Sequence, residues 1–446
     1  MTEGAPWKHI LLFCLPLLAG SVLQQLYNTA DTVIVGNFTG EKALAAVGTT
    51  NSMVFLFLAV AFGFSAGNGV LISQHYGAKE MDCVHRDGIS GILFLGILGG
   101  IGAITGILFS KLIFTKLVAV PEEILQETLL YFRIYSLGLV FQFLYNGLSA
   151  VLRGIGDSAA TLYFLLLASI LNILLDLWFV AGLQWGVAGA AHATNISQGC
   201  SVVAAWIYMH KKYNVFRYGL RDLQLEKDVV KETCRIGWPI ALQLVFVALG
   251  ITLIQRAVNS FGQVMTAAFT VGQRLEMYLH LPCNALMTTL ATYTGQNVGA
   301  GRIDRIRPGV RQGVLLSFVL TAVLSGILFA FSRKITEYFA LGPEAAGYGT
   351  RYLQTVSASV LILSLYVPLF GVFQGTRHAG ISSITALCAL SLRVGVTYLW
   401  KDGPLFGESI IWWNGFFGFG LGCILSFAYY GSNLWQRNAM NRIRNR

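Results

Sequence analysis

Apolar runs of about twenty residues recur along the whole chain, and short charged segments separate them. A helix of that length crosses the hydrocarbon core of a bilayer, and only helices and closed barrels satisfy their backbone there. The pattern predicts twelve membrane-spanning helices, at residues 10–36, 44–75, 88–114, 124–150, 158–182, 186–210, 232–258, 265–297, 312–333, 345–371, 380–400 and 407–433. We therefore expect an all-α polytopic membrane protein.

The composition agrees with this prediction. Of 446 residues, 55% are hydrophobic and 12% are charged, and a soluble domain could not bury so much apolar surface. The first apolar run, which follows Lys8, is longer than the core of a secretory signal and lacks an obvious cleavage site. We expect the first predicted helix to stay in the mature protein as part of a multi-pass chain in the cell membrane.

The net charge is +10, but its distribution indicates a lipid bilayer as partner and not a nucleic acid. One alternating set of segments holds 20 Lys and Arg residues, at 1–9, 76–87, 151–158, 211–235, 300–311, 376–379 and after 431. The opposite set of loops holds six. Cytoplasmic loops of membrane proteins carry such an excess of basic residues. The asymmetry predicts that both termini lie in the cytoplasm.

The two halves of the chain repeat. The segment QHYGAKEMD, which begins at Gln74, matches QNVGAGRID, which begins at Gln296, at an offset of 222 residues. Leu144 and Gly154 match Leu365 and Gly375 at an offset of 221. Each half contains six predicted helices, so both enter the membrane in the same direction. We predict two parallel six-helix lobes, at residues 1–210 and 232–446, joined by a cytoplasmic linker at 211–231.

Asp31 lies inside the first predicted helix, where a carboxylate costs about 2.5 to 3.5 kcal/mol on insertion scales. Such a group must face protein or a water-filled cavity, and function is the default expectation. Gln24, Tyr27, Asn28 and Asp31 fall at helical spacings of three and four, which places them on one face. The alternative is a packing stripe that satisfies a single acid.

A second polar group lies in the fifth and sixth predicted helices. Counted from the outer helix ends at ~1.5 Å per residue, Asp31 and Asp176 lie ~8 to 9 Å deep, Thr194 ~12 Å and Asn172 ~15 Å. Two carboxylates, an amide and a hydroxyl at similar depth predict an oxygen-rich pocket. It could hold a small hard cation or share a proton, because paired carboxylates favour one protonated form. Alternatively, Asn172 and Asp176 only join neighbouring helices.

The second half does not reproduce this group. The offset of 221 takes Asn172 to Arg393 and Asp176 to Thr397. Glu276 is the acid of this half that we place well inside a span, and Gln273 and Arg274 lie beside it. Glu276 could contribute to a surface for cationic substrates or to ion coupling. The alternative is an internal ion pair with Arg274 or Arg393.

Four sequence features together carry a family resemblance. They are LQQLYNTADTVIVG in the first helix, the repeated Q-x-x-G-A, the RGIGDS turn at residues 153–158, and N-x-x-x-D at Asn172 to Asp176. With them the whole chain resembles the multidrug and toxic compound extrusion (MATE) family of antiporters, and within it the DinF-like branch. The resemblance implies twelve helices in two lobes and export of amphipathic, often cationic, compounds in exchange for Na⁺ or H⁺.

The resemblance also implies roles for single residues. Asp31, Asn172, Asp176 and Thr194 fall on the positions of a coupling site in the first lobe, which would bind the ion itself if that ion is Na⁺. Gln24 and Tyr27 fall on positions that line the substrate pocket, and Pro16 on the proline that bends the first helix. The branch with a Na⁺ site in its second lobe pairs the acid at Glu276 with an Asp that the helix at 345–371 lacks. We therefore expect coupling in the first lobe.

Our hypothesis is a secondary antiporter in which cation or proton entry at Asp31 and Asp176 rearranges the first helix and releases substrate outward. We expect small amphipathic drugs or metabolites as substrates, and we assign Gln24, Tyr27, Asn28, Gln273 and Glu276 to their binding. We expect no cofactor besides the coupling ion, no nucleic-acid partner, and a monomer.

Two other classes of function were weighed. A lipid or lipid-linked oligosaccharide flippase could share the fold, and Arg133, Arg274 and Arg393 would favour it if they lined the cleft. A membrane-embedded enzyme is not expected, because the seven His are dispersed and neither H-E-x-x-H nor a phosphate-binding G-x-x-x-x-G-K motif occurs.

Overall fold

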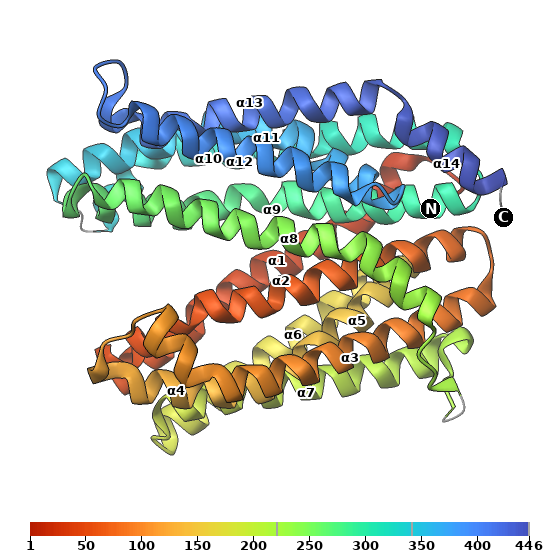
Figure 1. The fold of residues 1–446 in the computed structure, drawn as a ribbon, viewed down its shortest axis with the longest axis horizontal. Helices are drawn as coiled ribbons and strands as arrows, with labels where there is room; N and C mark the ends of the chain where they lie inside the picture. Colours follow the sequence, from red (N-terminus) through yellow and green to blue (C-terminus); the bar gives the residue numbers. More distant parts are fainter. Residues whose placement is uncertain (220–221, 340–341, 445–446) are drawn as a thin grey trace. The chain divides into compact units, whose positions relative to one another are not determined.

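The computed structural model describes residues 1–219, 222–339 and 342–444, and these residues fold into helices joined by short turns (Figure 1). The long helices are α1 (Pro6–Thr39), α2 (Glu41–Gly77), α3 (Met81–Leu112), α4 (Glu122–Leu137), α5 (Leu139–Ile155), α6 (Ser158–Asp176), α7 (Gly186–Lys212), α8 (Lys227–Asn259), α9 (Gln263–Gly299), α10 (Ile306–Tyr338), α11 (Pro343–Gly375), α12 (Ala379–Trp400), α13 (Ile410–Gly431) and α14 (Leu434–Arg444). Short helical turns add η1 (Ile113–Leu117), η2 (Leu177–Gly182), η3 (Asn214–Phe216), η5 (Ile303–Arg305) and η6 (Gly407–Ser409).

Each of the twelve predicted helices is present. Within the described ranges, nine helices are long and apolar enough to cross a membrane, and the bent pair α4–α5 makes a tenth. The two others are α7 and α9, which have 27 and 37 residues and are long enough to span but more polar. The prediction of an all-α polytopic fold is confirmed.

One predicted helix, at residues 124–150, is broken. It forms α4 and α5, which meet at Gly138 at an angle of 43°. The Asn195 side chain donates to the Ile134 carbonyl at 2.6 Å, and the Gly138 N–H bonds to Tyr135 instead, at 2.9 Å. A side chain that inserts into the helical hydrogen-bond ladder is a recognised cause of kinks. The bend therefore depends on a residue far along the chain.

The helix α14 was not predicted. Trp435 near its start is fully buried, stacks on Tyr430 with 5.4 Å between ring centroids, and donates its indole N–H to the Tyr430 carbonyl at 3.0 Å. The polar tail sequence lacks a long apolar periodicity, so this anchor gave no signal in the sequence.

The chain packs as two compact units. One consists of residues 15–241. In it α5 packs on α2 and α3, and α7 packs on α4, α5 and α6 (Figure 1). The described part of the predicted linker, which leaves out residues 220–221, belongs to this unit: Phe216 is buried, and His85 Nδ1 lies 2.6 Å from the Val215 carbonyl. The linker is therefore docked onto α3 over this stretch, while the predicted lobe bounds stay a prediction.

The other unit consists of residues 1–14 and 242–446. Its central helix is α11, which packs on α9, α10 and α13, while α12 packs on α13. Gly371 and Gly375 let α11 approach α9 closely, because a Cβ atom at either position would collide with the α9 backbone. Small residues at such contacts are typical of helix packing in membranes.

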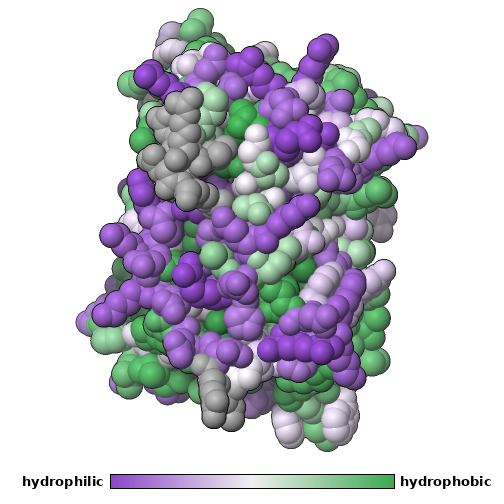
Figure 2. Space-filling view, turned by 90° about the vertical axis from the view of Figure 1, so that its right-hand side faces the viewer, coloured by the Kyte–Doolittle hydropathy of each residue, from purple (hydrophilic) through white to green (hydrophobic). Residues whose placement is uncertain are grey.

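Hydrophilic side chains cover much of the face drawn in Figure 2. In the unit of residues 15–241, the turn between α2 and α3 is one such polar helix end. Lys79 and Glu80 lie in that turn, and both are exposed. Long apolar helices that end in a polar surface of this kind are expected where the chain leaves a bilayer.

Candidate functional site

The predicted polar residues of the first lobe come together inside the unit of residues 15–241. Asn172 and Asp176 lie on α6 and Thr194 on the adjacent α7, with exposures of 0%, 0% and 4%. The Asn172 amide, oriented to satisfy both neighbours, donates to Asp176 Oδ2 at 2.7 Å and accepts from the Thr194 N–H at 3.2 Å. The N-x-x-x-D spacing works as predicted, because residues four apart stack on one helix face.

Asp31 of α1 completes this group, which we call the carboxylate site: Asp31, Asn172, Asp176 and Thr194. The carboxyl groups of Asp31 and Asp176 lie close enough to interact directly. Two carboxyl groups approach each other in this way when a proton or a cation lies between them, since two bare charges would repel. The structure therefore brings together all four residues that the sequence predicted.

Each acid of the carboxylate site also has one oxygen without a hydrogen-bond partner. In the described part of the chain, Oδ1 of Asp31 and Oδ1 of Asp176 are buried and have no hydrogen-bond partner. A buried polar atom left unsatisfied costs about 1 to 3 kcal/mol, and more when it is charged. The donor set of carboxylate, amide and hydroxyl oxygens suits a small hard cation or a proton. Among the described residues, no cluster of three or more His, Cys, Asp or Glu is placed to hold a metal ion.

Three tyrosines surround the carboxylate site. The Tyr27 hydroxyl lies near the Thr194 side chain, as expected from its place on the predicted polar stripe. Tyr131 and Tyr135 of α4 are buried, stack with 6.0 Å between ring centroids, and lie close enough to Asp31 to feel its charge. Sequence reasoning missed these two. Their spacing of four was visible, but it is equally typical of aromatic packing in a core.

The other residues of the α1 stripe do not reach the carboxylate site. Gln24 and Asn28 are exposed, while Tyr27 is half-buried. Pro16 lies inside α1, two residues beyond Cys14, where the helix passes from one packed unit to the other. A proline there removes one backbone hydrogen bond. The substrate roles of Gln24 and Asn28 and the hinge role of Pro16 stay predictions.

The second lobe holds a different polar group, the Glu276 cluster, formed by Glu276, His280, Tyr352, Arg393 and Asn414. Glu276 is 6% exposed, and the Tyr352 hydroxyl donates to its Oε2 at 2.5 Å. His280 Nε2 lies 3.5 Å from Oε1 but does not hydrogen-bond to it. Arg393 lies close enough to Glu276 to interact with its charge, but the two form no ion pair among the described residues. Its Nε donates to Asn414 at 2.9 Å.

The neighbours of Glu276 on α9 lie apart from this cluster. Arg274 is exposed, and no ion pair joins it to Glu276 within the ranges that the structure describes; Gln273 is half-buried. The proposed internal pairing of Glu276 is thus made by His280 and Tyr352, which the sequence analysis did not name. A substrate role for Gln273 and Glu276 stays a prediction.

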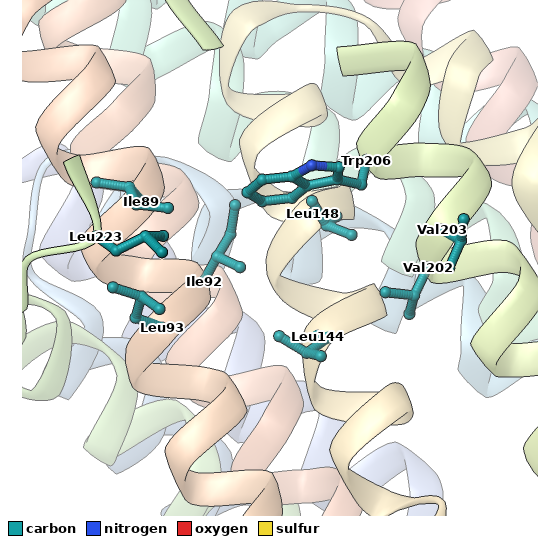
Figure 3. Close-up of a pocket in the computed structure, with 9 residues that line it drawn as sticks. All are labelled: Ile89, Ile92, Leu93, Leu144, Leu148, Val202, Val203, Trp206 and Leu223. Carbon is teal, nitrogen blue, oxygen red and sulfur yellow. The ribbon is translucent and has the colours of Figure 1, made fainter. Parts of the chain in front are cut away.

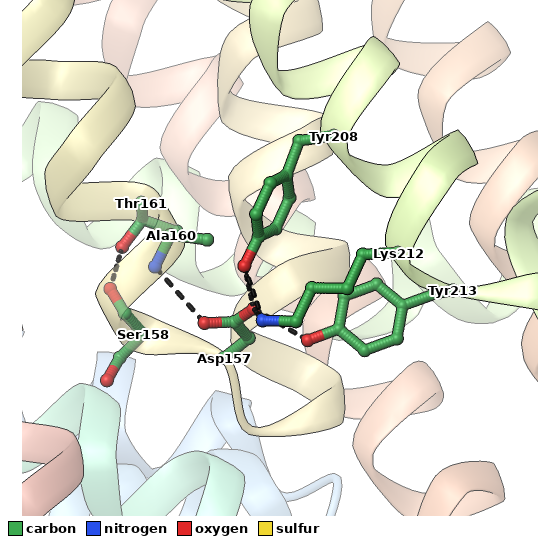
Figure 4. Close-up of polar contacts among 7 residues, drawn as sticks. All are labelled: Asp157, Ser158, Ala160, Thr161, Tyr208, Lys212 and Tyr213. Carbon is green, nitrogen blue, oxygen red and sulfur yellow. Dashed lines mark hydrogen bonds and ion pairs between the residues drawn. The ribbon is translucent and has the colours of Figure 1, made fainter.

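The RGIGDS turn has a structural role. Gly156 takes a left-handed conformation at φ 101°, and Asp157 caps α6 by accepting from the Ala160 N–H at 3.1 Å. The same carboxylate accepts from Tyr208 at 2.9 Å, Lys212 at 2.9 Å and Tyr213 at 2.6 Å (Figure 4). Burial raises the pKa of Asp157, but these hydrogen bonds outweigh it and hold the pKa below its ordinary value. The turn ties α6 to the end of α7.

An apolar cavity of about 290 Å³ lies in the same unit, between α3, α5 and α7 (Figure 3). Trp206 of α7 and Leu223 of the linker lie on its wall, and every lining side chain is apolar: Ile89, Ile92, Leu93, Leu144, Leu148, Val202, Val203, Trp206 and Leu223. Because it offers no charged group, the cavity cannot bind the coupling ion.

Comparisons with known proteins agree on one family. The MatE family model matches residues 16–178 and 239–399, one match in each half, as the internal repeat predicts. The probable multidrug resistance protein YoeA of Bacillus subtilis (strain 168) is 25% identical over 99% of this chain and 97% of its own length. The probable multidrug resistance protein YpnP of the same organism is 28% identical over 96% and 94%. An outward-facing multidrug resistance MATE family transporter of the MOP superfamily superposes with a TM-score of 0.91 at 23% identity, covering 98% of this chain and 97% of that one.

Proposed function

Because the chain belongs to the MatE family of membrane transporters, we propose that it is a secondary active antiporter that exports amphipathic, often cationic, small molecules in exchange for H⁺ or Na⁺. Its relatives are named as multidrug resistance proteins, which supports this substrate class. The family consists of transporters, so an enzyme is excluded. The DinF-like branch and the cytoplasmic position of both termini stay predictions.

One observation carries the antiport mechanism: two buried carboxyl groups in contact, each with an unsatisfied oxygen. Without a cation, two charges about 4 Å apart repel by about 4 kcal/mol at an effective dielectric constant near 20. A proton or Na⁺ from outside removes that repulsion and lets Asp31 close onto Asp176. The state of the ion therefore sets the position of Asp31.

The helix that carries Asp31, α1, is suited to move when the ion binds. Only 22% of the apolar 18-residue stretch of α1 is buried, whereas 44% of the corresponding stretch is buried in the span that carries Asp176. We propose that cation binding moves α1 relative to α6, that this weakens substrate binding near Tyr27, and that substrate leaves outward. Such a cycle requires different substrate affinities in the two states, since a ligand that binds both equally shifts nothing.

The experiment is ethidium transport in inverted membrane vesicles, with Na⁺ and pH gradients imposed separately. We expect wild type to follow one of the two gradients, which names the coupling ion, and Asp31→Asn to follow neither. Asp402→Asn is the control, because it makes the same change at an exposed acid that has no part in the proposed mechanism. Transport by Asp31→Asn and Asp176→Asn at the wild-type rate would contradict the coupling assignment.

The flippase alternative required basic residues gathered on one surface. Arg133 donates to Ser110 at 2.8 Å in one unit. In the other, Arg393 bonds to Asn414 inside the helix packing while Arg274 is exposed. These arginines differ in their partners and exposure, and the relatives named as multidrug resistance proteins make the antiporter the better supported function.

A further inference from the structure

One side chain of α7 joins the carboxylate site to the break between α4 and α5. The Asn195 amide donates to the Ile134 carbonyl of α4 at 2.6 Å. In a continuous helix that carbonyl would accept from the Gly138 N–H, four residues further on. We propose that Asn195 is a positioning residue for ion coupling, because its amide holds the break that places two tyrosines of α4 beside the carboxylate site; this rests on the proposed antiport function.

Gly138 makes room for the Asn195 amide. A Cβ atom at this position would lie 1.8 Å from Asn195 Oδ1, so a larger residue would push the amide away from the Ile134 carbonyl. The Gly138 N–H donates instead to the Tyr135 carbonyl at 2.9 Å. Both backbone groups at the break therefore keep a hydrogen-bond partner, which a kink inside a membrane span requires.

The break sets the direction of the segment of α4 that carries Tyr131 and Tyr135. At ~1.5 Å per residue, Tyr131 lies ~10 Å along the helix from Gly138. If α5 stayed in place and the angle of 43° were lost, Tyr131 would move by about 7 Å. Both rings are buried and lie close enough to Asp31 to interact with its charge. A displacement of this size would separate Tyr131 from Asp31.

The two tyrosines matter to the ion because they shield Asp31 from water. Attraction between a carboxylate and a cation strengthens as the local dielectric constant falls, and buried rings beside the carboxylate lower it. The helix α7 controls both features with adjacent residues: Thr194 belongs to the carboxylate site, and Asn195 holds the break. We therefore expect loss of the Asn195 amide to weaken ion binding without removing any member of the carboxylate site.

The second lobe lacks this arrangement in the part of the chain that the structure describes. Its counterpart of α4 and α5 is α11, which is a single helix. The repeat offset is 222 at Pro121 and 221 at Leu144, so the first lobe fits one more residue into this stretch. The offset of 221 takes Asn195 to Phe416, which cannot donate to a carbonyl. The break and the amide that holds it therefore occur in the lobe with the paired acids.

The test measures ion binding without transport. Purified protein in lipid nanodiscs is melted over a range of Na⁺ concentrations and of pH, because an ion that binds the folded state stabilises it. The stabilisation that Asp176→Asn abolishes is assigned to the carboxylate site. We expect Asn195→Ala to raise the ion concentration for half of this stabilisation by at least about fivefold. A purely structural role would lower the melting temperature and leave that concentration unchanged.

The matched control is Asn146→Ala. The Asn146 amide also donates to a backbone carbonyl in this lobe, that of Gln142 at 2.8 Å, but within its own helix and away from the break. We expect this variant to change the ion concentration for half-maximal stabilisation by less than about twofold.

Two further variants act on the break from the other side. Gly138→Ala keeps Asn195 but displaces its amide, so we expect the same rise as in Asn195→Ala; it decides the question if Asn195→Ala does not fold. Gly138→Pro in the Asn195→Ala background removes the N–H that would rejoin the Ile134 carbonyl, and proline breaks a helix by itself. Gly138 has φ −79°, close to the angle that proline requires. We expect this double variant to recover an ion affinity within about twofold of wild type.

Three results would overturn the proposal: an unchanged ion affinity in both Asn195→Ala and Gly138→Ala, an equal loss in Asn146→Ala, or no recovery in the double variant. A wild type without ion-dependent stabilisation would overturn it as well. A wild type with ion-dependent stabilisation but no ion-driven ethidium transport in inverted vesicles would instead overturn antiport and leave the positioning role of Asn195 in place.

Discussion

The carboxylate site of the first lobe and the Glu276 cluster of the second lobe are built on repeated halves of one chain, but their electrostatics differ. Asp31 and Asp176 contact each other, and each keeps a buried oxygen without a partner. Glu276 is also buried, but the Tyr352 hydroxyl donates to it and Arg393 lies close enough to interact with its charge. The first group therefore pairs two acids, whereas the second places a single acid near an arginine.

This difference indicates that the two lobes have different roles in ion coupling. A site with unsatisfied charge gains most from binding an ion, while a site that is already compensated gains little. The repeated backbone has kept its helix packing glycines, such as Gly154 and Gly375, while its polar interior has diverged. We infer that ion coupling belongs to the first lobe.

The largest effect is expected from Asp176→Asn. A tenfold gradient of the coupling ion corresponds to about 1.4 kcal/mol, which supports a roughly tenfold accumulation of a cationic substrate exchanged one for one with that ion. Without the paired carboxylate this accumulation should disappear, so that dye levels inside and outside inverted vesicles become equal. An accumulation ratio at the wild-type level would contradict the assignment of ion coupling to the first lobe.

A smaller effect is expected from Tyr27→Phe. It removes a hydroxyl that lies near Thr194 beside the carboxylate site, and a polar contact of this kind contributes about 0.5 to 1.5 kcal/mol. The ion concentration for half-maximal export should rise by about twofold to tenfold. Tyr278→Phe, which alters an exposed tyrosine of α9, is the control and should leave it unchanged. Equal shifts in both variants would contradict a role for Tyr27 at the carboxylate site.

Asp157→Asn should lower stability without changing the coupling ratio. The pKa of Asp157 is lowered by its partners Tyr213, Lys212 and Tyr208 against the effect of burial. Its carboxylate therefore stabilises the fold above the unfolded pKa, near 3.9, and the stability is lost as pH falls through the folded pKa. Thermal unfolding at neutral pH should occur a few degrees lower in the variant. A wild-type melting temperature would contradict this, and an altered coupling ratio would extend the coupling site to α7.

The smallest effect is expected from Glu276→Gln. Because the Tyr352 hydroxyl already donates to this acid and no second acid pairs with it among the described residues, its neutralisation should change the ion-driven accumulation by less than about twofold. The measurement is the same dye ratio in inverted vesicles. Loss of accumulation in this variant would place coupling in both lobes.

Much of the fold could be predicted from the sequence, because apolar length and the repeat determine the helices and their direction. The carboxylate site could also be predicted, since buried acids are rare in spans and the spacing of Asn172 and Asp176 fixes a face. The break at Gly138 could not, because the Asn195 side chain that causes it arrives from another helix. The hydrogen bond from Tyr352 to Glu276 could not be predicted either, because Tyr352 also arrives from another helix.

The central claim is that substrate and cation compete through the carboxylate site. It is tested most directly by adding substrate to purified transporter in weakly buffered solution and measuring released H⁺ with a pH-sensitive dye and released Na⁺ with an ion-selective electrode. We expect wild type and Glu276→Gln to release one kind of cation on substrate binding, and Asp176→Asn to bind substrate without releasing either. Release that persists in Asp176→Asn and disappears in Glu276→Gln would contradict the account.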